Sequence, residues 1–241
     1  MNTSMPISLK RLSLALLISL GLISSAFAAP GGNSGGGGYG GDVSQNMPRK
    51  SPEQRAVEQY LRGVKYRDEA IAFELEAVKE DDDKKKQKLL KKAQKEYANA
   101  QKRFERTLKT LPNAFEAHSD LGFVLRKQGN YDESLAAYNK ALSLNPNYWP
   151  AIEYRGEAFL ALNDLEAAKE AYMILFREDR QLADVLMAAM RIWLRDASDT
   201  AEISPESKQA FSDWIDKRLT ISQQVHDLSP DSQDPWQTAA L

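Results

Sequence analysis

The sequence predicts an all-α protein: a short helical solenoid that opens with a long antiparallel helical hairpin and ends with capping helices. Two observations carry this prediction. From residue 51 onward, apolar residues recur at three- and four-residue steps, the spacing of one face of an α-helix. Between residues 115 and 182 the chain also resembles itself at a period of 34, which is typical of stacked pairs of helices.

Composition excludes several kinds of chemistry. The chain has 241 residues, of which 42% are hydrophobic, enough for one domain or a short repeat array. It contains no cysteine, which excludes disulfides, thiolate nucleophiles and cysteine-based zinc sites. A formal net charge of −2 gives no strong overall bias toward nucleic acid or toward basic partners.

Residues 1–28 have the three parts of a secretory signal peptide. Two basic residues come first, an apolar run over 12–23 follows, and a small-x-small cleavage motif ends at Ala28. The apolar run is shorter than the roughly 20 residues that a bilayer-spanning helix needs. We therefore expect cleavage after Ala28 rather than an uncleaved membrane anchor. This predicts secretion across the inner membrane, and a periplasmic product if the source is Gram-negative.

Residues 29–50 are rich in glycine and have almost nothing to bury, which predicts a flexible linker. Three of its glycines, Gly36, Gly38 and Gly41, fit a G-x-G-x-x-G spacing. No strand precedes them and no βαβ unit surrounds them, so we regard the match as accidental. We expect no cofactor.

Residues 51–112 predict an extended helical hairpin. Ser51 is a good helix cap and Pro52 suits the first helical position. No further proline occurs before Pro112, and two amphipathic stripes flank the polar stretch 80–88, where we expect the turn. Each arm would have about 25–28 residues and a length of roughly 40 Å.

Residues 113–148 carry the most specific motif in the chain. Small residues stand where helices approach closely, larger ones fill the space between them, and Gly129 and Pro146 end the two helices. The motif residues are Leu121, Gly122, Leu125, Gly129, Tyr131, Tyr138, Ala141, Leu142 and Pro146. This pattern resembles the tetratricopeptide repeat, a 34-residue helix–turn–helix unit. His118 and Ser134 depart from it, replacing the usual aromatic and alanine.

Neighbouring segments resemble the same repeat less closely. A shift of 34 residues gives a second unit at 149–182, in which Asn163 replaces Gly129 and Arg180 replaces Pro146. Its missing proline suggests that its second helix runs on or turns differently. A backward shift predicts that the hairpin 51–112 is a repeat stretched by about 25 inserted residues, because Gly63 then stands in the glycine place. We expect capping helices over 183–224 and a flexible tail over 225–241.

The resemblance implies a protein–protein interaction scaffold that binds a partner segment on the concave face formed by the first helix of each unit. The residues that line this face by position are Glu116, Ser119, Phe123, Arg126, Lys127, Glu153, Glu157 and Leu160. Phe123 beside Arg126 suits a binding anchor. The alternative, that Phe123 packs on a neighbouring helix, fits the sequence equally well.

Candidates for catalysis or metal binding are few, and we predict that the chain is not an enzyme. His118 is expected in a packing position, His226 in the solvated tail, and Asp81-Asp82-Asp83 in a solvated turn without calcium-loop spacing. A second hypothesis concerns residues 84–109, where eleven Lys and Arg residues face only two glutamates. They could bind a polyanion or an anionic membrane surface, or they could be an ordinary solvated face, partly balanced by Glu74, Glu76 and Glu80.

Overall fold

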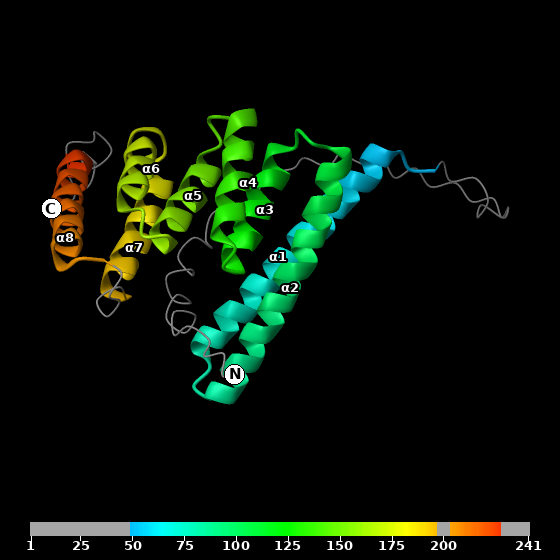
Figure 1. The fold of residues 1–241 in the computed structure, drawn as a ribbon, viewed down its shortest axis with the longest axis horizontal. Coiled ribbons are helices and arrows are strands. Elements are labelled where there is room, and N and C mark those ends of the chain that lie inside the picture. Colours follow the sequence, from blue (N-terminus) through cyan, green and yellow to red (C-terminus); the bar gives the residue numbers. More distant parts are fainter. Residues whose placement is uncertain (1–48, 197–202, 228–241) are drawn as a thin grey trace, which may run out of the picture. The chain divides into compact units, whose positions relative to one another are not determined.

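The structure is a computed structural model that describes residues 49–196 and 203–227. Within these ranges it contains eight α-helices and no strand, so the all-α prediction is confirmed (Figure 1). None of these helices combines the length and hydropathy needed to span a bilayer. Along the sequence, the described chain divides into two compact units between residues 146 and 147, and each is described by itself. The predicted signal peptide, most of the linker and residues 228–241 lie outside the described ranges.

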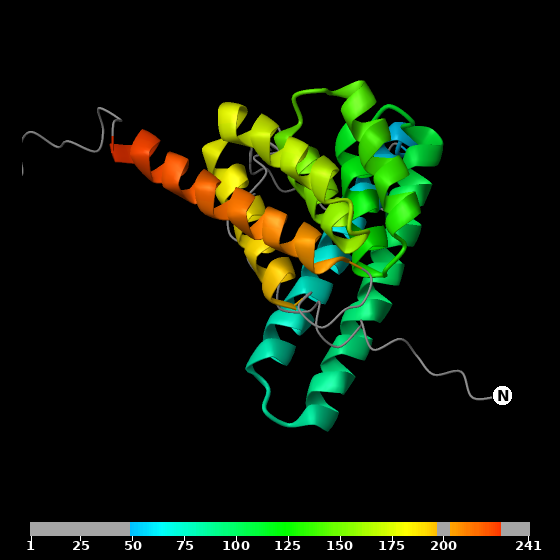
Figure 2. The same ribbon diagram turned by 60° about the vertical axis from the view of Figure 1, so that its left-hand side comes forward.

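Two long helices form the first part of unit 49–146. Helix α1 spans Pro52–Lys79 and α2 spans Asp83–Thr110, and they pack along each other in an antiparallel hairpin (Figures 1 and 2). Ser51 caps α1 in a capping box with Gln54. Asp82 caps α2 by accepting hydrogen bonds from the amides of Lys84 and Lys85 at 2.9 and 3.0 Å.

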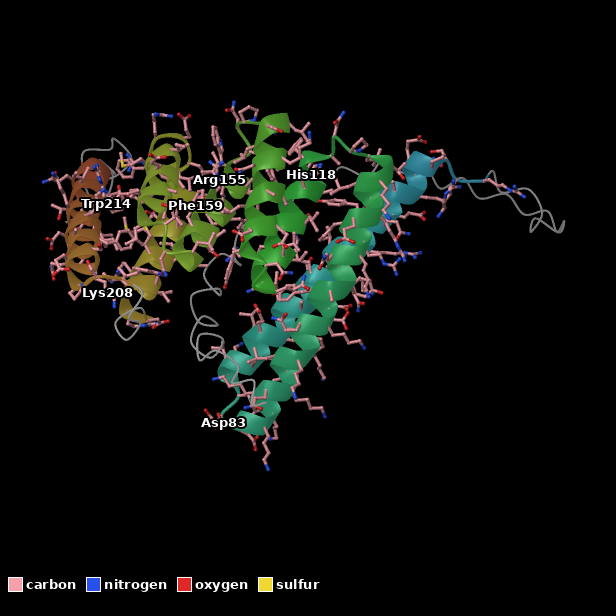
Figure 3. The ribbon with its side chains drawn as sticks, viewed as in Figure 1. Asp83, His118, Arg155, Phe159, Lys208 and Trp214 are labelled. Atoms are coloured by element: carbon pink, nitrogen blue, oxygen red, sulfur yellow. The ribbon has the colours of Figure 1, made fainter. Side chains whose placement is uncertain are left out.

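The turn of the hairpin is shorter than the sequence indicated. We expected the polar stretch 80–88 to form it, whereas α2 already begins at Asp83. The cap at Asp82 explains the difference, because it satisfies the first free amides of a helix that then runs through the lysines. The lysines are therefore helical, and Asp83 stands at the tip of the hairpin (Figure 3).

Helices α3 (Phe115–Lys127) and α4 (Tyr131–Leu144) complete this unit as a second antiparallel pair. The turn between them depends on Gly129, whose φ of +83° lies in the left-handed region. Its amide donates to the Arg126 carbonyl at 2.9 Å, which satisfies one of the last free carbonyls of α3.

One contact recurs in both helix pairs of this unit. A Cβ built on Gly122 would lie 2.6 Å from Tyr138, and one built on Gly63 would lie 2.6 Å from Phe104. Each glycine therefore lets an aromatic side chain of the second helix press against the backbone of the first. The two pairs share this contact although 16 residues separate its members in one pair and 41 in the other, counted from the sequence. This is the arrangement expected if the hairpin is a repeat with about 25 residues inserted.

Unit 147–227 begins with α5 (Trp149–Ala161), α6 (Leu165–Glu178) and α7 (Arg180–Asp196). Asn163, in the place of Gly129, adopts a φ of 62° between α5 and α6. Asparagine tolerates this left-handed conformation better than most residues, so the turn survives the loss of glycine. Helix α7 packs on both α5 and α6.

The second helix of this unit turns at one residue instead of running on. Asp179 ends α6 with an extended backbone, φ −149° and ψ 96°, and its amide donates to the Leu175 carbonyl at 2.7 Å. Its side chain accepts from the Leu182 amide at 3.1 Å in the first turn of α7. Asp179 thus closes one helix and caps the next, which replaces the missing proline.

Helix α8 (Pro205–Asp227) joins this unit through an aromatic cluster. Phe211 is fully buried and meets Trp193 of α7 edge-on, with ring centroids 5.5 Å apart. Trp214, which Figure 3 labels on α8, meets Tyr172 of α6 edge-on, with ring centroids 5.4 Å apart. The helix includes residues 225–227, which we had placed in the tail, and His226 lies in its last turn.

Candidate partner-binding face

The α3 residues predicted to bind a partner follow one stripe along that helix. Ser119, Phe123, Arg126 and Lys127 are spaced by four, three and one residues, so they face similar directions at about 100° per residue. All four are buried, and Glu116, in the first turn, is partly exposed. Burial of two cations requires nearby partners, because an unpaired buried charge is strongly unfavourable.

Phe123 packs on a neighbouring helix, which is one of the two alternatives that the sequence left open. Its ring packs edge-on against Tyr97 of α2, with centroids 6.2 Å apart, and only 5% of the residue is exposed. The Arg126 guanidinium also lies over this ring at 5.4 Å and the Lys127 ammonium at 5.7 Å. Phe123 therefore packs on a neighbouring helix and carries two cations at the same time.

Lys127 is tied to the long hairpin. Its ammonium forms an ion pair with the Glu74 carboxylate of α1, and the two side chains are 1% and 12% exposed. Tyr97 lies 5.6 Å below the same ammonium. Burial, and next the negative charge of Glu74, raise the pKa of the Tyr97 phenol far above its ordinary value, so it stays neutral.

A second polar contact joins α1 to α3 one turn before Phe123. Asp120 accepts a hydrogen bond from the Tyr60 hydroxyl at 2.9 Å and forms an ion pair with Arg67. Burial raises the pKa of the Asp120 carboxyl, and the positive charge of Arg67 partly offsets this effect. Asp120 thus anchors α3 to α1 at the edge of the predicted binding stripe.

Sequence reasoning missed the α1 side of this face. Tyr60, Arg67 and Glu74 are spaced by seven residues, which places them on one side of α1. The apolar residues of α1 predict the hairpin, and the sequence interpretation assigns Glu74 to balancing the basic residues of α2. The seven-residue spacing of three polar residues was the available signal, and it required knowing that α3 lies beside α1.

The predicted residues of α5 belong to the other unit. Glu153, Glu157 and Leu160 are 0%, 7% and 3% exposed, so all three are buried. Burial also lowers the pKa of Arg155 on the same helix, whose guanidinium lies 5.8 Å from the Phe159 ring (Figure 3). Both first helices of the predicted repeats therefore carry buried charges as well as apolar residues.

The remaining candidates have simple surroundings. The Nε2 atom of His118 lies 2.9 Å from the Pro112 carbonyl, a contact that holds the start of α3 to the preceding turn (Figure 3). Asp82 of the acidic triplet is the cap of α2 described above. Within the described ranges no group of three or more acidic or histidine side chains is placed to hold a metal ion.

A shallow surface cavity of about 270 Å³ lies between α1 and α2. Its lining consists of Arg62, Lys65, Tyr66, Glu69 and Arg103. Arg103 spans the two helices, because it donates to Gln59 at 2.8 Å and lies over Tyr66 at 5.8 Å. Lys65 faces Glu69 at 3.8 Å, so part of the positive charge is balanced within the cavity.

Antiparallel helix pairs, left-handed turns and glycine–aromatic contacts inside the pairs define a helix–turn–helix repeat protein. Residues 115–148 match the family model of the tetratricopeptide repeat, over the segment that contains α3 and α4. Residues 115–148 are therefore a tetratricopeptide repeat, as their motif residues predicted. Repeats of this class support protein–protein interaction, and this general scaffold role holds for the chain.

Proposed function

We propose that the chain is an exported scaffold of the bacterial cell envelope that holds a segment of a partner protein on its first repeat helices. The observation that carries this proposal is the stripe on α3, where an aromatic ring and two cations come together inside a matched repeat. Aromatic residues and arginine are enriched among the residues that dominate binding energy. No catalytic role is part of this proposal.

Pre-organisation favours α3 as the binding element. Lys127 is fixed by Glu74 and Asp120 by Arg67, so the long hairpin holds α3 from the side. Side chains that are already ordered lose less conformational entropy when a partner binds. The partner segment itself is identified only by class: a peptide whose apolar and acidic groups complement Phe123 and Arg126.

The test is capture of a partner from an envelope extract by the tagged chain, at low and high salt. We expect the double variant Phe123→Ala/Arg126→Gln to lose the partner and the wild type to keep it in salt, because a packed contact is screened less than surface charge. Lys140→Glu is the matched control, since it changes an exposed residue of α4 in the same repeat.

Because Phe123 is buried, each variant needs a thermal melt beside the capture experiment. If the double variant unfolds, Glu116→Lys replaces it, since Glu116 is a partly exposed member of the same set. A folded variant that still captures the partner would show that α3 is not the binding element.

Export has its own measurement. The proposed signal peptide ends at Ala28, so mass spectrometry of the protein recovered from the periplasmic fraction should give a mature chain that begins at Ala29. A full-length chain in the cytoplasmic fraction would contradict the envelope location without affecting the binding proposal.

A further inference from the structure

A straight line of basic side chains runs along α2. Its members are spaced by four, three, four, seven, four and three residues, and all are exposed; they are Lys84, Lys88, Lys91, Lys95, Lys102, Arg106 and Lys109. At about 100° per residue they fall within an arc of roughly 60° of the helix circumference. At about 1.5 Å per residue the line is roughly 38 Å long. We call these seven residues the basic stripe.

The basic stripe lies opposite the packed side of α2. The mean direction of the six buried residues of this helix lies about 165° away from the stripe by the same helical geometry; they are Leu89, Ala93, Tyr97, Ala100, Phe104 and Thr107. Neighbouring helices touch other sides of α2: Arg103 contacts α1 and Gln94 donates to the Lys127 carbonyl of α3. The stripe is therefore the outermost line of this helix pair.

Four acidic residues of α1, the turn and α2 have ion-pair or hydrogen-bond partners outside the stripe. Glu74 pairs with Lys127, and the Glu80 carboxylate accepts from the Asp82 amide. Within α2, Glu96 accepts from Asn99 and Glu105 from Gln101, both at 2.8 Å. Among the described side chains, none of the seven members of the stripe takes part in an ion pair. Within the described residues, the positive charge of the stripe is therefore not compensated by ion pairs.

We propose that the basic stripe docks the protein on a bilayer surface that carries anionic phospholipid headgroups. A plane touches a cylinder along one straight line, and the stripe occupies such a line on α2. Seven cations on one helix face lie in the range of four to eight that is typical of electrostatic binding to anionic lipids. Six of the seven are lysines, whose compact charge and long stem suit diffuse attraction to many phosphates.

Other polyanions fit the stripe less well. A protein interface usually has an apolar core, yet the exposed large apolar residues of the described chain, Leu61, Leu162 and Met173, all lie outside α2. Binding of single-stranded nucleic acid commonly uses aromatic stacking, and the stripe contains no aromatic residue. The stripe is also on a different helix from the α3 face, so this inference stands apart from the proposed function.

The test is flotation of the full chain with vesicles of phosphatidylcholine alone or mixed with phosphatidylglycerol, over a range of salt. The stripe variant is Lys91→Glu/Lys95→Glu/Lys102→Glu, and glutamate keeps the helix propensity of lysine. We expect wild type to bind only the mixed vesicles, binding to fade as salt rises, and the stripe variant to bind about a hundredfold more weakly.

The matched control is Lys140→Glu/Arg191→Glu/Lys217→Glu, which makes the same charge change at exposed residues of α4, α7 and α8. It should retain most of the binding. Circular dichroism checks that each variant is folded, and the neutral variant Lys91→Gln/Lys95→Gln/Lys102→Gln, with an intermediate loss, replaces a misfolded one.

Three results would overturn the proposal. Wild type could fail to bind the mixed vesicles at low salt. The control could lose as much binding as the stripe variant, which would mean that overall charge is responsible. Finally, polyglutamate or duplex DNA could bind more tightly than the vesicles at equal anionic charge, which would assign the stripe to another class of macromolecule.

Discussion

At the scale of single residues, two glycines of the matched repeat have different structural roles. Gly122 provides room, because a Cβ there would lie 2.6 Å from a tyrosine that is fully buried. Gly129 provides conformation, because a Cβ there would meet nothing within 4 Å, yet its φ is +83°. The same substitution should therefore act through packing at one position and through backbone strain at the other.

We expect Gly122→Ala to lower the free energy of unfolding by about 1–3 kcal/mol through overpacking. Gly129→Ala should lower it by about 1–2 kcal/mol through left-handed strain. Gly129→Asn should be nearly neutral, because Asn163 already occupies the equivalent turn of the other unit at φ 62°. Urea denaturation measures all three free energies of unfolding. If Gly129→Asn destabilised the protein as much as Gly129→Ala, the left-handed conformation would not be the reason for glycine at this position.

Asp120 gives a prediction about pH. Its folded-state pKa is raised by burial, so the folded chain binds this proton more readily than the unfolded chain. Stability from this group is therefore greatest below the ordinary carboxyl pKa and falls as the pH rises through the window up to the raised value. Asp120→Asn removes the titratable carboxyl, so it should also remove this dependence of the free energy of unfolding on pH.

The measurement is the free energy of unfolding of wild type and Asp120→Asn over the acidic range. The difference, wild type minus variant, should decrease as the pH rises. In the variant, Arg67 keeps its charge but loses the carboxylate beside it, which adds an offset that does not vary with pH. The slope rather than the offset is therefore the test. A difference that grows with pH would mean that Arg67 outweighs burial and that the pKa is lowered.

At the scale of helices, α8 is held by aromatic rings rather than by a close-packed repeat contact. Phe211 is buried between Trp193 and Trp214, with ring centroids at 5.5 and 6.2 Å. Phe211→Ala should therefore cost about 3–5 kcal/mol and release α8 from α7. Near-ultraviolet circular dichroism should lose tryptophan signal while the far-ultraviolet signal changes little.

Two observations keep this prediction specific. Asp213→Ala, an exposed residue of the same helix, should leave both signals unchanged. Hydrogen exchange should then show faster exchange in α8 of Phe211→Ala, with α3 and α4 unaffected. Retention of the tryptophan signal in Phe211→Ala would mean that contacts other than this ring hold α8.

Most helix positions could be predicted from local chemistry. Ser51, Gly129 and Pro146 mark helix ends through capping, left-handed φ and a missing amide, and these effects need no tertiary structure. The turn at residue 80 was placed poorly because capping by Asp82 competed with the polar composition around it. The sequence did not decide whether the chain turns near residue 180, because the single residue Asp179 both ends α6 and caps α7.

The candidate site was only half predictable, for a physical reason. The α3 residues follow from their position in the repeat, and Phe123 beside Arg126 is visible in the sequence. Glu74, the partner of Lys127, lies about 50 residues earlier on a helix lengthened by the insertion. The same helix carries Tyr60 and Arg67, the partners of Asp120, which the sequence did not place in the site. Such long-range pairs depend on which helices meet, and helical periodicity carries no information about that.

At the scale of the whole chain, the division at residue 146 leads to a last prediction. Unit 49–146 has its own core, in which Tyr97, Phe104 and Tyr138 are fully buried and the two glycine–aromatic contacts lie. In repeat proteins, stability is approximately a sum over units and their neighbours. A fragment of residues 49–146 should therefore fold alone, with a free energy of unfolding of roughly 5 kcal/mol.

Urea titration of this fragment, followed by circular dichroism, should show one cooperative transition. Phe104→Ala should abolish the transition, because the lengthened hairpin would lose its main contact with Gly63. The exposed variant Glu105→Ala should melt like the parent fragment. A gradual loss of helix in the parent fragment would mean that the lengthened hairpin and one repeat are not enough for a stable array, which normally needs at least three repeats.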